Sequence, residues 1–437
     1  MAEVDQERGL VYDIKLSSVG PGNVTGQDSI FEARNMDLAM KLHYIRCVYY
    51  FGSRAFEGLT TLAIKEPIFV WLNRFPMTAG RFRRDESGRP YIKCNDCGVR
   101  FIEAKCRTSL DEWFEMSDDI AMREKFLCSN SIIGPELSFS PLIYIQLTKF
   151  KCGGMAVGLS WAHVLGDVFS AAEYMNNWSR VATGFGLNRP INKMADGPTK
   201  PKYFNGRVKV SEDPLSVKRV DSVGDNWVFA AKRKTAAFSF DVTPTQLSHL
   251  RSKLSRNGID SPAFEAISAV IWRCIAGIRG GESEPRIVTI CKRSEDNEKF
   301  RVLRNNQVVL VVKAESPVME ANPSDLAALM KNGGIDERAG IEEAVERDHG
   351  LPDFIVYGAN LTFVNLEGAD FYDFEYSGQK PVRVSCRIDG VGENGAVLVL
   401  PAAEGGGGGR SVMAILPENE VAAVKSELKR EGFLLMG

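Results

Sequence analysis

The hydrophobic pattern in the middle of the chain predicts a β-hairpin followed by a helix. Residues 142–150 are rich in β-branched and aromatic side chains. Residues 152–161 are again apolar and begin with Cys-Gly-Gly, which suits a tight turn between two strands. Residues 168–183 then place small and apolar side chains at helical spacing. Earlier in the chain, residues 36–50 show helical or mixed spacing.

The second half interleaves strand and helix patterns. Residues 236–242 alternate like a strand, and Thr243 with Pro244 then marks a helix start, because proline suits the first turn. A helix that begins at Ser261 and Pro262 is apolar almost all round, so we expect it to be buried. Further apolar runs of strand length and one last helical pattern follow at 287–291, 307–313, 395–400 and 417–432. The irregular order predicts an α/β fold with mixed sheets.

The chain length predicts two domains. A chain of 437 residues exceeds one comfortable hydrophobic core. Residues 184–227 are rich in Gly, Pro, Asn and Lys, and such a composition cannot bury enough apolar surface to pack as a core. We therefore expect an N-terminal domain at 1–183, a crossover linker at 184–227 and a C-terminal domain at 228–437.

Composition narrows the class of protein. Hydrophobic residues make up 44% and charged residues 25% of the chain, as in ordinary globular proteins. A net charge of -2 gives no global field for nucleic acid or an anionic membrane, so we expect no nucleic-acid partner. No apolar run has the roughly 20 residues that span a bilayer, and no signal peptide is visible, so we expect no membrane span. Nine unevenly spaced cysteines favour a reducing compartment.

His163, one of four histidines, is the candidate for chemistry. It lies between a predicted strand and a predicted helix, with Gly166 and Asp167 just after it. A Ser-His-Asp triad is a poor alternative, because Ser160 lies three residues back on the strand and faces the other way. The other histidines have no metal-ligand spacing to it, so we expect no metal. Two interpretations remain: a satisfied core histidine, or a lone general base that deprotonates an alcohol or amine attacking an activated acyl group.

The motif His163-Val-Leu-Gly-Asp167 resembles the HxxxD motif of the BAHD acyl-CoA-dependent acyltransferases of plants. Residues 75–82 resemble that family's segment ending in Ala-Gly-Arg, and residues 94–104 resemble its segment with Asn-Asp-x-Gly. Residues 261–274 resemble its helix ending in Trp-Arg-Cys, and Arg293 falls where the family has the arginine of its D-x-R motif. The resemblance covers nearly the whole chain.

This resemblance implies a fold and a chemistry. The family has two similarly built α/β domains joined by a crossover loop, with an active-site channel between them. His163 would be the general base, and acyl-CoA would be a co-substrate or ligand, with no tightly bound cofactor. The family's HxxxD aspartate is structural and pairs with an arginine, so Asp167 would pair with Arg293. Gly166 and Asp373 would be further structural supports.

Two departures from the family pattern affect the expected donor side of the channel. The family's DFGWG motif corresponds to residues 373–381, where Glu375 replaces a glycine and Tyr376 replaces the tryptophan. Glu375 would be strained by about 1–2 kcal/mol if its site needs a positive φ. The aspartate of D-x-R is Cys291, and the Gly-Tyr-Phe-Gly-Asn segment that follows in the family is absent.

These departures are similar to those of one branch, the eceriferum/Glossy wax proteins. The strings at 36–51, 150–171, 220–227 and 357–366 resemble that branch. The resemblance implies a role in cuticular wax synthesis at the cytosolic face of the endoplasmic reticulum. There the protein would promote elongation of very-long-chain acyl-CoA as an accessory to the condensing enzyme of the elongase, a ketoacyl-CoA synthase, without needing His163. The alternative is an active acyl-CoA-dependent O- or N-acyltransferase with His163 as general base, so whether the chain is an enzyme stays open.

Overall fold

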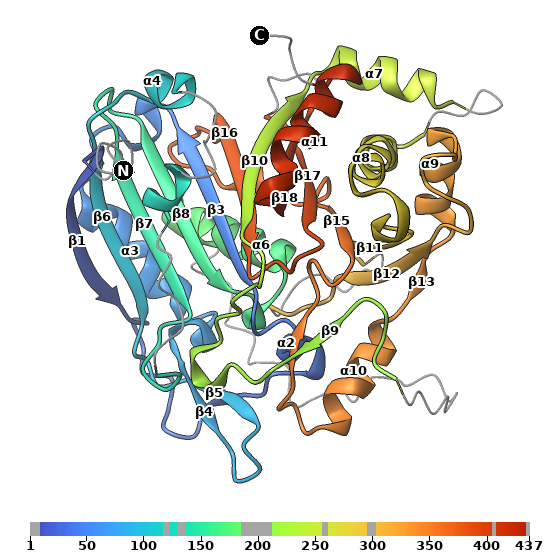
Figure 1. Cartoon of the computed structure of the whole chain (residues 1–437). Coiled ribbons are helices and arrows are strands. Elements are labelled where there is room, and N and C mark those ends of the chain that lie inside the picture. Colours follow the sequence, from blue (N-terminus) through green and yellow to red (C-terminus); the bar gives the residue numbers. More distant parts are fainter. Residues whose placement is uncertain are drawn as a thin grey trace.

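Two mixed β-sheets lie side by side, and helices cover them (Figure 1). The computed structural model describes residues 9–116, 123–128, 136–184, 212–255, 261–294, 303–403 and 408–433.

The first sheet has six strands in the order β1-β6-β7-β8-β3-β16. Their bounds in that order are Val11–Val19, Val99–Cys106, Ile143–Lys149, Met155–Ala162, Tyr44–Phe51 and Arg383–Asp389. The pair β6 and β7 is parallel and the other neighbours are antiparallel. The predicted hairpin is therefore confirmed as β7 and β8.

The mixed spacing of residues 36–50 reflects two elements rather than one. A short helix, α2 (Asn35–Ala39), precedes β3, whose eight residues are all buried. The aromatic and β-branched residues of β3 suit a central strand that is covered on both faces.

The second sheet has seven strands in the order β10-β18-β17-β15-β11-β12-β13. Their bounds in that order are Thr235–Val242, Arg410–Pro417, Ala396–Pro401, Leu361–Asn365, Ile287–Lys292, Val308–Lys313 and Ile335–Asp336. Each apolar run of strand length in the second half forms one of these strands. Two small sheets complete the β-structure: β2 (Ile30–Phe31), β5 (Pro90–Lys93) and β4 (Arg81–Arg84), and β14 (Asp353–Ile355) with β9 (Lys218–Val220).

The division of the chain into two consecutive domains needs one correction. Strand β16 belongs to the predicted C-terminal domain, yet it pairs with β3 over its full length and closes the first sheet. The first sheet therefore needs chain from both halves. Most of the predicted linker lies outside the described residues, and its last part contains β9, which pairs with β14.

The predicted helices form where their sequence signals place them. The helix after the hairpin is α6 (Val168–Ala182), with Asp167 at its N-cap. Thr243 caps α7 (Pro244–Lys253) by a reciprocal bond with Gln246, and α8 (Ala263–Arg279) is buried along most of its length. The remaining helices are α3 (Thr61–Leu72), α4 (Leu110–Glu115), α9 (Pro323–Asn332), α10 (Arg338–Arg347) and α11 (Glu418–Arg430).

The largest apolar cluster joins the two halves of the molecule. It includes Trp161 and Leu165 from the first half and Val364 and Leu398 from the second. Side chains from both sheets therefore fill the region around the hairpin end. In the described part of the chain, no helix is long and apolar enough to cross a bilayer.

Candidate active site at the end of β8

His163 lies directly after β8, at the start of a 3-10 turn (His163–Leu165) that leads into α6. Its backbone N–H donates to the carbonyl oxygen of His43 at 3.1 Å, which joins the turn to the chain before β3. The predicted position between strand and helix is thus confirmed. The side chain, however, is 0% exposed. The resemblance implied a base that faces a channel, whereas the imidazole of His163 is enclosed here.

The imidazole is hydrogen-bonded to a tyrosine that the sequence analysis did not single out. Nε2 of His163 lies 2.9 Å from the hydroxyl of Tyr357, which is itself fully buried. The Tyr357 hydroxyl donates its single proton to Oε1 of Gln307 at 2.9 Å. The histidine Nε2–H must therefore be the donor to the tyrosine oxygen. His43 packs edge-on against Tyr357, with 4.9 Å between ring centroids.

Burial makes His163 a weak base. Desolvation lowers the pKa of His163 to about 4, and polar interactions with its own backbone and with the Asn305 side chain oppose the shift only in part. An imidazole with this pKa is neutral at pH 7, but it holds a proton less well than a base with a pKa near 7. In this tautomer the unprotonated nitrogen is Nδ1, which is buried and has no hydrogen-bond partner among the described residues, so a substrate would have to enter the packed interior to reach it.

Asp167 is held by backbone amides rather than by an arginine. Its carboxylate accepts from the N–H of Ser170 at 2.9 Å, as the N-cap of α6, and from the N–H of Asn306 at 3.0 Å. Its own N–H donates to the carbonyl oxygen of Arg304. Burial raises the pKa of Asp167 to about 6, although these amide bonds oppose the shift.

The expected pairing of Arg293 with Asp167 needs correction. Arg293 donates to the carbonyl oxygen of Gly368 at 2.7 Å and lies 3.7 Å from the carboxylate of Asp370. The guanidinium also lies over the ring of Phe169 on α6. Arg293 therefore ties the end of β11 to the segment before Phe371.

A second buried carboxylate completes the arrangement. Asp37 on α2 accepts from the backbone N–H of Asn305 at 3.1 Å and from its side-chain amide at 2.9 Å. The same amide group donates to the carbonyl oxygen of His163 at 2.9 Å. Burial raises the pKa of Asp37 despite these bonds. The one signal for this residue in the sequence was an aspartate at the start of an apolar segment.

Gly166 is required sterically by the same contact. A β-carbon on Gly166 would lie 2.9 Å from the backbone nitrogen of Arg304 and 2.8 Å from the β-carbon of Ser170. Its φ of 152° is also one that other residues rarely adopt. Glycine therefore lets residues 304–306 approach the turn that carries His163.

The degenerate DFGWG segment forms a structural cluster of aromatic rings. Phe374 packs against Tyr49 with 5.0 Å between centroids, and Tyr376 stacks on Phe56 at 4.6 Å. Trp178 of α6 contacts both of them.

One expectation for this segment needs correction, and the condition set for strain at Glu375 is not met. Asp373 has an exposed side chain, so the support comes from its aromatic neighbours. Glu375 does not have a positive φ, and the strained residue is Ser377, with φ 48°. The turn, and with it the strained backbone, therefore follows Tyr376.

Sequence comparison places these features in a family. The pattern that defines the Transferase family matches residues 19–305. The chain belongs to this family, the BAHD acyltransferases. Protein ECERIFERUM 26 of Arabidopsis thaliana is 41% identical over 99% of this chain and 98% of its own length. Protein ECERIFERUM 2 of the same plant is 35% identical over 97% and 99%. A hydroxycinnamoyltransferase of Narcissus pseudonarcissus is 25% identical over 91% and 95%.

Solved structures show the same fold. Vinorine synthase superimposes with a TM-score of 0.70, at 16% identity, over 96% of this chain and 98% of that one. TRI101 of F. graminearum, complexed with coenzyme A and deoxynivalenol, gives a TM-score of 0.67 at 14% identity, over 92% and 97%. The expected two-part α/β acyltransferase fold is therefore confirmed.

Replacing Asp167 tests whether its role in this BAHD chain is to hold backbone amides. We expect Asp167→Ala to lower the free energy of unfolding by about 2–4 kcal/mol, from a lost N-cap and an unpaired buried amide at Asn306. Asp167→Asn keeps only one of the two acceptor oxygens and turns its NH2 group toward the other amide, so we expect a smaller but real loss of about 1–2 kcal/mol. Denaturant unfolding followed by tryptophan fluorescence measures both. Equal losses for the two variants would contradict this account.

The buried imidazole predicts a specific pH dependence. The folded pKa of His163 is about 4 and the ordinary value is 6.5, so the unfolded chain binds more protons between these limits. Acidification from pH 6.5 to 4 should therefore cost about 3 kcal/mol of stability through this residue. His163→Gln removes that term, while Asp167, whose raised pKa acts in the opposite sense, is common to both proteins. Denaturant unfolding at pH 7, 5.5 and 4 measures the free energy of unfolding of both proteins. We expect the difference between the wild-type and His163→Gln values to shrink as the pH falls. The same pH dependence of the free energy of unfolding in both proteins would show that His163 is not buried in neutral form.

Proposed function

We propose that this protein acts in cuticular wax synthesis by promoting elongation of very-long-chain acyl-CoA, without acyl transfer by His163. The similarity to ECERIFERUM 26 and ECERIFERUM 2 over nearly the whole chain supports the wax role. The elongation role continues the branch resemblance of the sequence.

The enclosed imidazole carries the non-catalytic part of the proposal. A general base must present an unprotonated nitrogen to the hydroxyl or amine that it activates. Here Nε2 of His163 donates its proton to Tyr357, and the unprotonated Nδ1 is buried in the interior, so neither nitrogen is presented to a substrate. The loss of the DFGWG glycines and the D-x-R aspartate agrees with relaxed demands on catalysis.

The proposed partner is the condensing enzyme of the elongase, a ketoacyl-CoA synthase. On this proposal the protein works at the cytosolic face of the endoplasmic reticulum, where it contacts the condensing enzyme and shifts the length of its products. Acyl-CoA is the proposed ligand, as co-substrate of the partner rather than of His163.

Co-expression in yeast with a plant ketoacyl-CoA synthase tests the proposal. We expect the wild-type protein to lengthen the acyl chains and His163→Gln to lengthen them equally, because Gln removes the base but keeps a polar group of similar size. Loss of a true general base lowers a rate by about 10²- to 10⁴-fold, so catalysis predicts that the variant loses the effect. Gas chromatography of fatty acid methyl esters gives the readout. Soluble protein levels and melting temperatures control for misfolding, and loss of lengthening by a folded variant would refute the proposal.

The alternative is an active O- or N-acyltransferase. One observation favours it: the turn of His163, Gly166 and Asp167 is held by several buried hydrogen bonds, as a pre-organised site would be. On this alternative Tyr357 must release Nε2 when substrate binds. Purified protein would then transfer acyl groups from acyl-CoA to an alcohol or amine, and the free thiol of CoA would accumulate only with His163 present.

A further inference from the structure

A cavity lies far from His163, at the other end of the same strand. It has a volume of about 600 Å³, within the range of small-molecule sites. Met155, the first residue of β8, lines it, whereas His163 follows the last residue of that strand. At about 3.3 Å per residue the two positions are about 25 Å apart. The cavity is therefore separate from the candidate active site.

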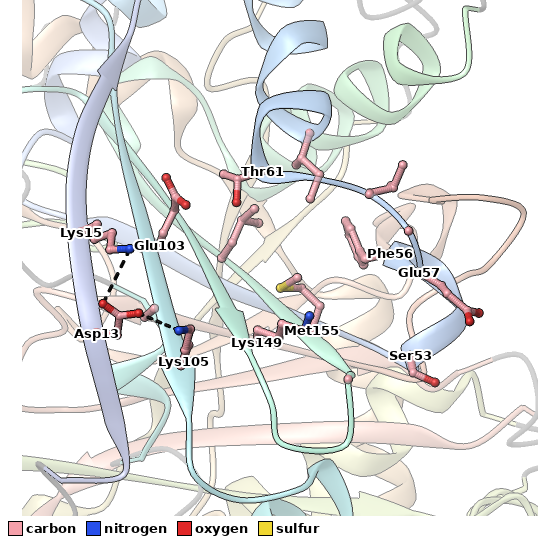
Figure 2. Close-up of a pocket in the computed structure, with 16 residues that line it drawn as sticks. Asp13, Lys15, Ser53, Phe56, Glu57, Thr61, Glu103, Lys105, Lys149 and Met155 are labelled. Atoms are coloured by element: carbon pink, nitrogen blue, oxygen red, sulfur yellow. Dashed lines mark ion pairs between the residues drawn. The ribbon is translucent and has the colours of Figure 1, made fainter.

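The cavity has two unlike walls (Figure 2). One wall is charged and is formed by side chains of β1, β6 and β7, among them Lys15, Lys105 and Lys149. The other wall is largely apolar and is formed by the turn and helix start around α3, with β7 and β8. Its apolar members are Phe56, Leu59, Ile64, Leu147 and Met155.

Most of the lysines at the charged wall are already paired with carboxylates. Asp13 forms ion pairs with Lys105 at 2.8 Å and with Lys15 at 3.8 Å. Lys65 of α3 reaches Glu103 at 2.6 Å. Of the residues that line the cavity, three are lysines and three are carboxylates, so these charges balance, and Lys65 lies behind the lining. Glu57 also lines the cavity, but Figure 2 shows its carboxylate directed away from the lysines.

Lys149 is the lysine of this wall whose charge is available to pair with a ligand. The structure gives its ammonium group neither a hydrogen bond nor an ion pair with any described residue, unlike Lys15, Lys65 and Lys105. In Figure 2 its side chain lies beside Met155, where the charged and apolar walls meet. An anion at this point would be next to an apolar surface.

The β1 backbone is distorted at this site. The register of β1 against β6 shifts between Tyr12 and Lys15, and Asp13 in that bulge has φ 52°. A non-glycine residue in this conformation costs about 1–2 kcal/mol. The bulge brings the Asp13 carboxylate between Lys15 and Lys105, so those two lysines are occupied while Lys149 is not.

We propose that this cavity binds an amphipathic carboxylate: an alkyl chain whose acid group pairs with Lys149 and whose chain lies along Phe56, Ile64 and Met155. The apolar path continues outside the cavity, because Leu59, which lines it just before α3, is 39% exposed and Leu62 in the first turn of α3 is 63% exposed. A chain too long for the cavity would run over these two residues. The inference does not depend on the wax role or on His163.

Calorimetric titration of the full-length protein with decanoate, below its micelle concentration, tests the proposal. We expect saturable binding of one decanoate. Lys149→Met should weaken it by about 2- to 5-fold, the loss of an ion pair with an exposed lysine. Lys151→Met is the matched control, because Lys151 lies two residues further along, on the exposed turn, and does not line the cavity. Butyrate and decanol separate the two halves of the ligand, and each should bind more weakly than decanoate.

Three outcomes would overturn the proposal. The first is the absence of saturable decanoate binding to the wild-type protein. The second is an equal affinity of the Lys149→Met and Lys151→Met proteins. The third is tighter binding of decyl phosphate than of decanoate, which would assign the site to a phosphate head group. A photoreactive decanoate provides the location, and we expect adducts in peptides from residues 53–64 or 147–155. Adducts confined to peptides with His163 or Tyr357 would also refute the cavity as the site.

Discussion

Two buried carboxylates, Asp37 and Asp167, hold the two halves of this molecule in register. Each accepts a backbone N–H from the segment before β12, Asp37 from Asn305 and Asp167 from Asn306. A carboxylate removed from water must be satisfied by donors, and an unpaired one would be too costly to retain. Backbone amides provide these donors here, and their positions are fixed by the chain. The turn that carries His163 is built around this contact.

The same segment explains how a histidine can persist in an acyltransferase fold without facing a substrate. Asn305 donates to the carbonyl oxygen of His163, and Gln307 holds the hydroxyl of Tyr357 against the imidazole. The HxxxD turn thus has a structural role at three of its five positions: a ring in a hydrogen-bond chain, a glycine at a close backbone contact, and an aspartate that caps α6. Retention of the motif in this chain is therefore weak evidence for catalysis.

Strand β8 connects two different environments. At one end it places His163 in the buried interior shared by both sheets, and at the other it lines an open cavity that includes Lys149. The first sheet that contains β8 is completed by β16 from the far end of the chain. Backbone hydrogen bonds therefore connect a strand from the second half of the chain directly to the first sheet.

Much of the local structure was determined by the sequence itself. The hairpin β7–β8, the helix after Asp167, and the starts of α7 and α8 follow from apolar periodicity, turn glycines and proline positions, which act over a few neighbouring residues. The resemblance of the motifs to a known family was enough to predict the two-part fold.

The sequence did not determine which residues are the hydrogen-bond partners of the buried side chains. Arg293 was the reasonable partner for Asp167, yet Asn306 took that place, and Tyr357 was found beside His163 although 194 residues separate them. Such contacts depend on how distant segments pack. A local sequence pattern does not specify which donor will lie next to a buried acceptor. For the same reason, only the tertiary structure decided that the imidazole is enclosed and that Lys149 faces an open cavity.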